Sequence, residues 1–267
     1  MAFTSFSLAK WFSNLSCKRI IARLDIKGEN VIKGIQMEGL RVIGDPNILA
    51  KKYYEAGADE IIFIDTVASL YRRENIQRII KKASENVFIP ITVGGGIRSL
   101  ENASQLFSSG ADKVAINSAA VTNPRLITEI ARYFGSQSVV VSVEAKQIEQ
   151  TWEVYTNNGR EPTGIMVGDW VEELAALGAG EVILSSVDRD GTKKGMDIEL
   201  LRYVRERCQL PIIAASGVGS MQDIYEVFTN CNPDAVAIGS AFHSGVIEVG
   251  TLKNELRELG LEIRNQN

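Results

Sequence analysis

Two copies of one short segment decide the fold of this chain. Residues Pro90–Gly96 read PITVGGG, and Pro211–Gly217, which begin 121 positions later, read PIIAASG. Each copy is a short β-branched run that ends in a glycine turn, which is typical of a buried parallel strand. Two further segments repeat at nearly the same interval: GADE at 57–60 returns as GAGE at 178–181, and VAINSA at 114–119 returns as VAIGSA at 236–241. The chain therefore consists of two similar halves.

Outward from this repeat, short apolar runs alternate with helical patterns along the chain. The eight runs that we predict as strands are Ile20–Asp25, Ile61–Asp65, Ile91–Val93, Lys113–Asn117, Val139–Glu144, Val182–Ser186, Ile212–Ala214 and Ala235–Gly239. Helices are predicted between them, for example over Pro46–Ala56, Glu74–Ser84 and Pro124–Tyr133. The alternation fits a doubly wound sheet or a closed barrel, and the duplicated half favours a (β/α)8 barrel, or TIM barrel, with twofold symmetry.

Length and composition agree with one barrel domain over residues 19–267, preceded by an N-terminal extension of residues 1–18. The chain has 267 residues, of which 45% are hydrophobic and 23% charged, as in a globular protein with a large core. The net charge of −4 argues against nucleic acid and anionic membranes as partners. Cys17, Cys208 and Cys231 show no metal-ligand spacing, and their odd number favours a reducing cytoplasm over a disulfide framework.

The extension does not have the pattern of a signal peptide. Polar residues such as Ser5, Lys10 and Asn14 interrupt it, and no apolar run in the chain is long enough to span a membrane. We expect a flexible extension or the product of an upstream start codon. The alternative is an amphipathic contact helix through Phe6, Trp11, Phe12 and Leu15.

Glycines and small polar residues follow four of the predicted strands, at the end of the barrel where active sites lie. Backbone N–H groups in such turns can hold phosphate oxygens. We therefore predict two phosphate-binding stations, the first at Gly96, Asn117 and Ser118 and the second at Gly217, Gly239 and Ser240. The alternative is that the glycines only make tight turns, but two clusters at equivalent places favour phosphate. Two stations across one mouth predict a ligand with a phosphate at each end.

Two carboxylates end equivalent strands and face each other between the stations. Asp25 ends the first predicted strand and Glu144 ends the fifth. Such a pair can move protons in opposite directions at two ends of a substrate, so we predict that they act as general acid and base. The alternative is that each only pairs with a lysine or caps a helix. The single histidine, His243, is interpreted as structural, and no pattern indicates a metal or a cofactor.

With these residues assigned, the stretch from Lys18 to Ile263 resembles the HisF family, the cyclase subunit of imidazole glycerol phosphate synthase. The motifs that carry the resemblance are Arg19-Ile20-Ile21, Leu24-Asp25, Lys33-Gly34, Val93-Gly94-Gly95-Gly96-Ile97, Gly110-Ala111-Asp112-Lys113-Val114, Phe134-Gly135-Ser136-Gln137, Asp188-Arg189-Asp190-Gly191-Thr192 and Ala241-Phe242-His243. The related isomerase HisA shares the fold, but the segments that begin at Phe134 and Asp188 are similar to the cyclase.

The resemblance implies an ammonia-dependent lyase of histidine biosynthesis. HisF-type barrels receive ammonia from a glutaminase partner, HisH, and convert the bis-phosphorylated nucleotide PRFAR to imidazole glycerol phosphate and AICAR. It implies that Asp25 and the strand 5 acid are the acid/base pair and that Lys33, Asp190 and Gly191 join the ligand-binding residues. It also implies an ammonia gate at the bottom of the barrel and a glutaminase interface; the matching positions are Arg19, Glu60, Lys113 and Glu181 for the gate and Asp112 for the interface. A ring of alternating charges can seal a pore by mutual pairing and open when a partner docks.

Three residues at the mouth depart from the family pattern. Glu144 stands where the cyclase has aspartate, and its extra methylene moves the carboxylate by roughly 1 Å. Arg23 replaces a small cysteine and is expected to point into the barrel on the same side as Asp25, where a buried arginine needs an anionic partner and lowers the pKa of that carboxyl. Ser216 stands where the pattern has glycine, and it is expected to stiffen one phosphate loop.

Another set of motifs is similar to a second HisF paralogue, the AglZ-type protein of acetamidino-sugar clusters for surface polysaccharides such as lipopolysaccharide. These motifs are Arg23–Gly28, Glu38–Arg41, Tyr53–Glu60, Ala68–Tyr71 and Val143–Lys146. This resemblance implies that the barrel passes ammonia to a separate sugar amidotransferase. We therefore favour an ammonia-relay subunit over a working cyclase, and both over a barrel that only scaffolds or activates its glutaminase.

Overall fold

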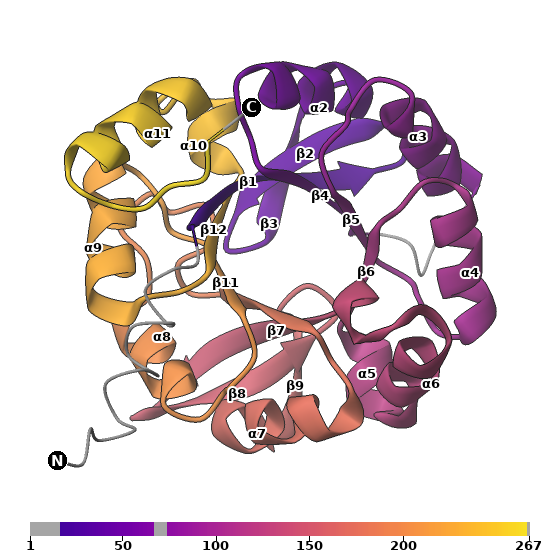
Figure 1. Ribbon diagram of the computed structural model, residues 1–267. Helices are drawn as coiled ribbons and strands as arrows, with labels where there is room; N and C mark the ends of the chain where they lie inside the picture. The colour runs from indigo at the N-terminus through magenta and orange to yellow at the C-terminus, as the bar shows by residue number, and fades with distance from the viewer. Residues whose placement is uncertain (1–16, 67–73, 266–267) are drawn as a thin grey trace, which may run out of the picture.

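The protein is a closed barrel of parallel strands with helices around it (Figure 1). The computed structural model describes residues 17–66 and 74–265. The strands follow one another around the barrel in the order β1 (Arg19–Lys27), β4 (Glu60–Asp65), β5 (Ile91–Gly94), β6 (Lys113–Ile116), β7 (Val139–Ile148), β10 (Glu181–Ser186), β11 (Ile212–Ala215) and β12 (Ala235–Ile238). Since β12 pairs with β1 and every neighbouring pair is parallel, the predicted (β/α)8 barrel is confirmed.

Helices cover the outside of the barrel between successive strands. They are α2 (Pro46–Glu55), α3 (Glu74–Ser84), α4 (Leu100–Ser108), α5 (Ser118–Thr122), α6 (Arg125–Phe134), α7 (Val167–Leu177), α8 (Ile198–Arg205), α9 (Met221–Cys231), α10 (Ser240–His243) and α11 (Val249–Glu258). Side-chain caps fix several of their starts. Asp45 accepts the backbone N–H groups of Asn47 and Ile48 at the start of α2, and Ser220 forms a capping box with Asp223 at the start of α9.

Two antiparallel hairpins extend the barrel at equivalent places, and the sequence did not predict them. After β1, the chain forms β2 (Asn30–Ile35) and β3 (Glu38–Gly44), and after β7 it forms β8 (Thr151–Thr156) and β9 (Glu161–Met166). Each hairpin pairs with the carboxyl-terminal part of the barrel strand before it. The hairpins therefore follow the twofold symmetry and raise the rim above the predicted mouth.

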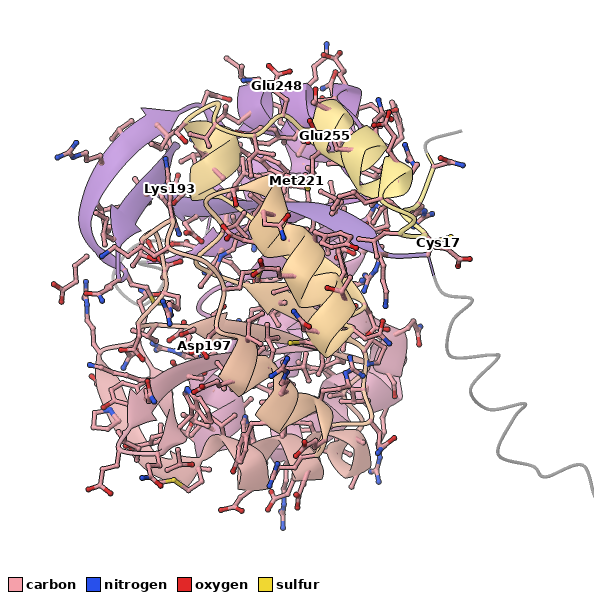
Figure 2. All side chains as sticks on the ribbon, turned by 90° about the vertical axis from the view of Figure 1, so that its left-hand side faces the viewer. Cys17, Lys193, Asp197, Met221, Glu248 and Glu255 are labelled. Atoms are coloured by element: carbon pink, nitrogen blue, oxygen red, sulfur yellow. The ribbon has the colours of Figure 1, made fainter. Side chains whose placement is uncertain are left out.

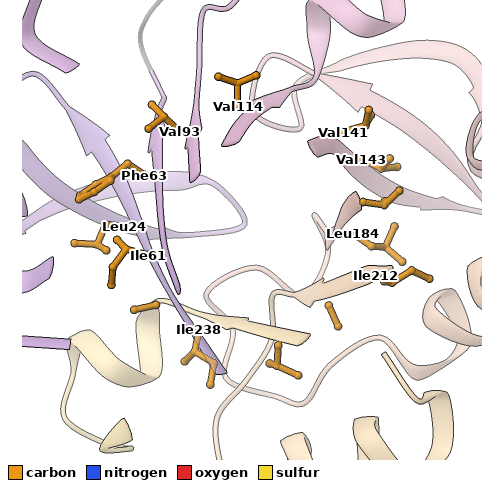
Figure 3. Close-up of a cluster of buried hydrophobic side chains, with 14 of the residues drawn as sticks. Leu24, Ile61, Phe63, Val93, Val114, Val141, Val143, Leu184, Ile212 and Ile238 are labelled. Atoms are coloured by element: carbon orange, nitrogen blue, oxygen red, sulfur yellow. The ribbon is translucent and has the colours of Figure 1, made fainter. Parts of the chain in front are cut away.

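Side chains of the barrel strands alternate between two hydrophobic layers because successive residues of a strand point to opposite faces. Figure 3 shows the outer layer, in which Leu24, Phe63 and Val143 point away from the barrel axis toward the helices. The inner layer fills the barrel itself and consists of Ile21, Ile62, Ala115, Val140, Ile183, Ile213, Ala215, Ala235 and Ala237. This apolar inner layer lies between the mouth of the barrel and the opposite end, where the strands begin.

The two ends of the barrel carry different residues. Figure 2 shows Lys193, which follows β10, at one end of the molecule and Cys17, which precedes β1, at the other. At the amino ends of the strands, Asp59, Asp112 and Asp234 each accept a backbone N–H from a neighbouring strand at 2.8 Å. These contacts fix the positions of neighbouring strand starts relative to one another.

Part of the sequence analysis concerns residues outside the described ranges. Residues 1–16 of the predicted extension and the motif Ala68–Tyr71 are among them. Lys18 forms an isolated parallel bridge with Ile263, which joins the start of the barrel to the end of the chain. No helix in the described ranges is long and apolar enough to cross a membrane.

Candidate functional site

Asp25 lies near the carboxyl end of β1 and is paired with two cations. Its Oδ1 accepts a hydrogen bond from Arg23 Nε, and its Oδ2 accepts one from Lys33 Nζ, both at 2.8 Å. Burial alone would raise the pKa of Asp25, but the positive charges of Arg23 and Lys33 outweigh it and hold that pKa well below its usual range. At neutral pH this carboxylate is ionised and doubly paired, which makes it a poor proton donor.

Arg23 reaches across the barrel interior from β1 to β10. Its Nη1 donates to Ser185 Oγ at 3.0 Å, and its side chain is only 11% exposed. The prediction that Arg23 points inward, finds an anionic partner and lowers the pKa of Asp25 is confirmed. Ser185 was not predicted. Alternation along β10 indicates that it faces inward, but the sequence does not show which side chain it meets there.

Glu144 occupies the matching place on β7, on the opposite side of the mouth. In either direction around the barrel, three strands separate β7 from β1. Glu144 Oε2 accepts the backbone N–H of Gly159, from the turn between β8 and β9, at 2.8 Å. Burial raises the pKa of Glu144, and neither this hydrogen bond nor the charge of Arg23 reverses the shift. Of the two predicted acid/base residues, Glu144 is therefore the better proton donor.

The first station forms a cavity at the ends of β5 and β6. The structure brings together the predicted residues Gly96, Asn117 and Ser118, and the cavity also contacts Gly95 and Glu144. Gly95 has a φ of 105°, and a Cβ at this position would lie 2.2 Å from the backbone oxygen of Asp65. Only glycine fits such a turn. The backbone can thus lie directly against the cavity.

The second station lies across the mouth at the ends of β11 and β12. The predicted residues that line it are Lys33, Asp190, Gly191, Gly217, Gly239 and Ser240. Lys33 Nζ lies 3.1 Å from Asp190 Oδ1, and the hydroxyl of Ser216 donates to the same oxygen at 3.2 Å. Ser216 has a φ of 82°, a conformation that favours glycine. The loop after β11 is therefore tied to Asp190 through a serine side chain.

His243 lies on α10, behind the second station. Its Nδ1 is 2.7 Å from the hydroxyl oxygen of Tyr53 on α2. Burial lowers the pKa of His243 to about 4, so the ring is neutral at neutral pH. The hydrogen bond joins α10 to α2, which agrees with a structural role.

At the amino ends of the strands, four side chains form what we call the charged ring: Arg19, Glu60, Lys113 and Glu181. Arg19 contacts Glu60 at 3.1 Å and also contacts Glu181, while Lys113 contacts Glu60 at 3.1 Å and Glu181 at 2.9 Å. Each carboxylate thus bridges both cations. Glu60 is 1% exposed and Glu181 6%. The structure brings together all four residues of the predicted ammonia gate, below the apolar inner layer.

Two neighbours complete this end of the barrel. Thr92, on β5, donates to Glu60 Oε1 at 2.5 Å, a contact that the sequence did not predict although alternation indicates that Thr92 faces inward. Asp112 is exposed next to the ring, and its carboxylate accepts the N–H of Ile91 at 2.8 Å. Asp112 therefore has a structural contact besides its predicted place at a partner interface.

Comparison with known proteins identifies the class to which this barrel belongs. Residues 19–248 match the model of the family described as "Histidine biosynthesis protein". The chain is 57% identical over 210 residues to imidazole glycerol phosphate synthase subunit HisF of Legionella pneumophila, which covers 78% of this chain and 99% of that protein. It is 48% identical over 247 residues to the subunit HisF of Thermotoga sp. (strain RQ2), covering 92% and 97%, and 45% identical over 248 residues to that of Myxococcus xanthus (strain DK1622), covering 93% and 98%. The chain belongs to the HisF family.

Proposed function

We propose that this chain is a HisF-type subunit that takes ammonia from a HisH-like glutaminase and releases it at the barrel mouth. The recipient in this proposal is a separate amidotransferase that converts an acetylamino group of a surface-polysaccharide sugar to an acetamidino group. The observation that carries the proposal is a contrast between the two ends of the barrel. The charged ring is complete, whereas Asp25 at the mouth is held by Arg23.

The charged ring supports the uptake of ammonia. Ammonia is neutral and can cross the apolar inner layer, whereas an unpaired ion is strongly disfavoured there. All four charges of the ring are paired in this closed state. A glutaminase that docks at this end, with Asp112 in its contact surface, is expected to draw these pairs apart.

The mouth supports a role other than efficient cyclisation. A general acid needs a pKa near the working pH, and the cations beside Asp25 lower its pKa instead. Glu144 retains a raised pKa, but it has no equally suited partner across the mouth. The acid/base pair of a cyclase is therefore altered at both places, Asp25 by its pairing with Arg23 and Glu144 by its longer side chain, while the charged ring is complete.

The second candidate function is that of the cyclase itself, which produces imidazole glycerol phosphate and AICAR from PRFAR and ammonia. It is favoured by the relatives, each named as a subunit of imidazole glycerol phosphate synthase, and by two carboxylates that face each other between two stations. Both candidates share the glutaminase partner and differ in what consumes the ammonia.

An assay with PRFAR and free ammonium separates the two. A misplacement of roughly 1 Å at a catalytic group can lower a rate by about 100-fold, so we expect turnover at least about 100-fold below that of the Thermotoga relative measured in parallel. Turnover equal to that of the relative would refute the relay proposal. Glu144→Asp and Arg23→Cys, separately and together, then identify which residue limits the reaction.

Glu153→Asp is the matched control for the shortened side chain. Glu153 is also buried and also accepts a backbone N–H, that of Gly164 at 2.6 Å, but it does not line the cavities of the mouth. A gain of cyclase activity in this variant would show that shortening a glutamate acts nonspecifically.

The relay itself is tested with a HisH-like glutaminase and a sugar amidotransferase from the same organism. Glutamine carrying ¹⁵N in its amide is supplied together with an excess of unlabelled ammonium. Passage through the barrel predicts a product enriched in ¹⁵N. Label diluted to the level of the surrounding ammonium would mean that ammonia is released to solution and is not relayed.

A further inference from the structure

The two stations are built by equivalent parts of the two half-barrels, yet they differ in the space they offer. The cavity at the first station has a volume of about 110 Å³, and that at the second about 20 Å³. A single water molecule needs roughly 10–15 Å³ on this measure. The loops of the second station thus enclose room for about one water molecule, and those of the first for a group several times larger. The wider mouth between them is a further cavity of about 350 Å³, which Arg23, Lys33 and Asp190 also line.

The first cause of the difference lies two residues before the paired carboxylates. Ser142 stands before Glu144 on β7 and lines the cavity of the first station, whereas Arg23 stands before Asp25 on β1 and lines that of the second. The guanidinium of Arg23 is fixed by Asp25 and by Ser185, at 2.8 and 3.0 Å. A long, anchored side chain therefore occupies space that a serine leaves open in the other half.

The second cause lies in the loops. Gly95 and Ser216 are 121 positions apart and hold equivalent places after β5 and β11, both with positive φ. Gly95 leaves its loop without a side chain, whereas Ser216 lines the second cavity and its hydroxyl is bound to Asp190. The side chain narrows the second station, and its hydrogen bond holds the narrowing loop in place.

Charge acts in the same direction. At the second station, Arg23 and Lys33 are already neutralised by Asp25 and Asp190, at 2.8 to 3.1 Å. At the first station, the exposed Arg98 lines the cavity, and the equivalent position 121 residues later is Gly219. An incoming dianion is therefore attracted to the first station, while at the second it has to compete with two carboxylates that already hold the cations.

We infer that the mouth binds a ligand with a single phosphate group at the first station, and that Arg23 and Ser216 exclude a second phosphate from the second station. Arg23 and Ser216 are then specificity-determining residues that select monophosphates over bisphosphates. The inference rests on the phosphate-binding role predicted for the stations. It does not depend on which separate amidotransferase receives the ammonia, but it is incompatible with the bis-phosphorylated PRFAR as the substrate of this barrel.

Counting bound phosphate tests the inference without any variant. Titration of the full chain with inorganic phosphate, followed by calorimetry or ³¹P NMR, is expected to show one site per chain. Ser118→Glu adds a negative charge to the first station and is expected to weaken that site by about tenfold or more. Ser240→Glu is its matched control at the second station and is expected to leave the affinity within about twofold. The reverse pattern in these two variants would overturn the inference.

A symmetrised variant tests the cause. Arg23→Ser together with Ser216→Gly gives the second station the residues that hold the equivalent places at the first station, Ser142 and Gly95, and Asp25 keeps Lys33 as a partner. We expect this variant to bind two phosphates, and to bind fructose 1,6-bisphosphate about tenfold more tightly than fructose 6-phosphate, a preference that the unchanged chain lacks. Ser216→Gly alone tests the loop if the double variant does not fold.

The outcomes are distinguishable. Binding of two phosphates by the unchanged chain would refute the exclusion of phosphate from the second station, but it would support both stations as phosphate-binding sites. No phosphate on the unchanged chain or on a folded symmetrised variant would refute the stations themselves, and the inference with them. Neither result bears on the ¹⁵N experiment, so the proposed relay stands or falls separately.

Discussion

Asp25 and Glu144 hold equivalent positions on β1 and β7 of the two half-barrels, yet their surroundings shift their proton affinities in opposite directions. Asp25 contacts Arg23 and Lys33 at 2.8 Å, and these cations hold its pKa well below the usual range. Glu144 is equally buried and accepts hydrogen bonds from the backbone N–H of Gly159, at 2.8 Å, and from the side chain of Asn117; burial outweighs both and raises its pKa. One carboxylate is thus fixed as an anion, and the other is able to carry a proton.

The raised pKa of Glu144 makes stability depend on pH in a defined direction. The folded chain holds this proton more tightly than the unfolded chain, so the contribution of Glu144 is present below the ordinary carboxyl pKa and is lost as pH rises through the raised value. Glu144→Gln, which cannot ionise, should therefore gain unfolding free energy relative to the unchanged chain as the pH rises from about 4 to about 7. Urea unfolding at both pH values measures this. The exposed Glu258→Gln serves as control, and a difference that does not change with pH would contradict the prediction.

Breaking the charged ring should destabilise the fold far more than breaking a surface ion pair. Glu60→Gln leaves Arg19 and Lys113 to share one buried carboxylate, and loss of a buried partner costs about 3–5 kcal/mol. Glu29→Gln breaks the pair with Arg78, whose side chains are 67% and 65% exposed, and should cost at most about 1 kcal/mol. Equal losses for the two variants in chemical unfolding would mean that the ring is open to water in solution.

Substitution of two glycines with positive φ distinguishes the stability cost of backbone strain from that of steric crowding. Gly164→Ala, at a φ of 75° with no other atom within 4 Å of the added Cβ, should cost about 1–2 kcal/mol. Gly95→Ala adds a Cβ 2.2 Å from the oxygen of Asp65 and should cost a further 1–3 kcal/mol or so, roughly the effect of overpacking. Thermal or urea unfolding of both variants measures the difference. Equal losses would show that the loop of the first station can shift to make room.

The single histidine offers a direct spectroscopic check. Burial lowers the pKa of His243 to about 4, and Tyr53 holds its Nδ1 at 2.7 Å. The unfolded chain protonates its histidine near the ordinary value of about 6.5, so the stability that the neutral ring provides declines as pH falls through that value. An NMR titration of the imidazole is expected to show no protonation of the folded chain above about pH 5. A midpoint near the ordinary value would place His243 in contact with water.

The fold could be predicted from the sequence because the duplicated half restricts the possible topologies. The eight barrel strands are buried on both sides, and such strands leave a clear apolar signal. The first hairpin leaves only a weak signal, since Ile35, Leu40 and Val42 are exposed in β2 and β3. In the second hairpin, Trp152 and Val154 of β8 are buried, and this short alternation is missed when only fully apolar runs are taken as strands. What a sequence pattern records is burial, and these strands extend the sheet by backbone hydrogen bonds.

The sequence predicts which residues form the site better than it predicts which residues they contact. The four residues of the charged ring and the linings of both stations come together as expected. Ser185 and Thr92 were missed because the partner of an inward polar side chain lies across the barrel, 162 positions from Arg23 in one case and 32 from Glu60 in the other. The unequal size of the stations was missed for the same reason, since it depends on where Arg23 is anchored.

The half-barrel repeat also allows the differences between the two halves to be tested by substitution. A gene made of two similar halves holds a spare version of each part, so one half can diverge while the other continues to serve. The halves differ at Arg23 and at Ser216. The residues at the equivalent positions are Ser142 and Gly95 respectively. For each position at which the halves differ, the residue at the equivalent position of the other half is thus a substitution to test, and no other protein is needed as a template.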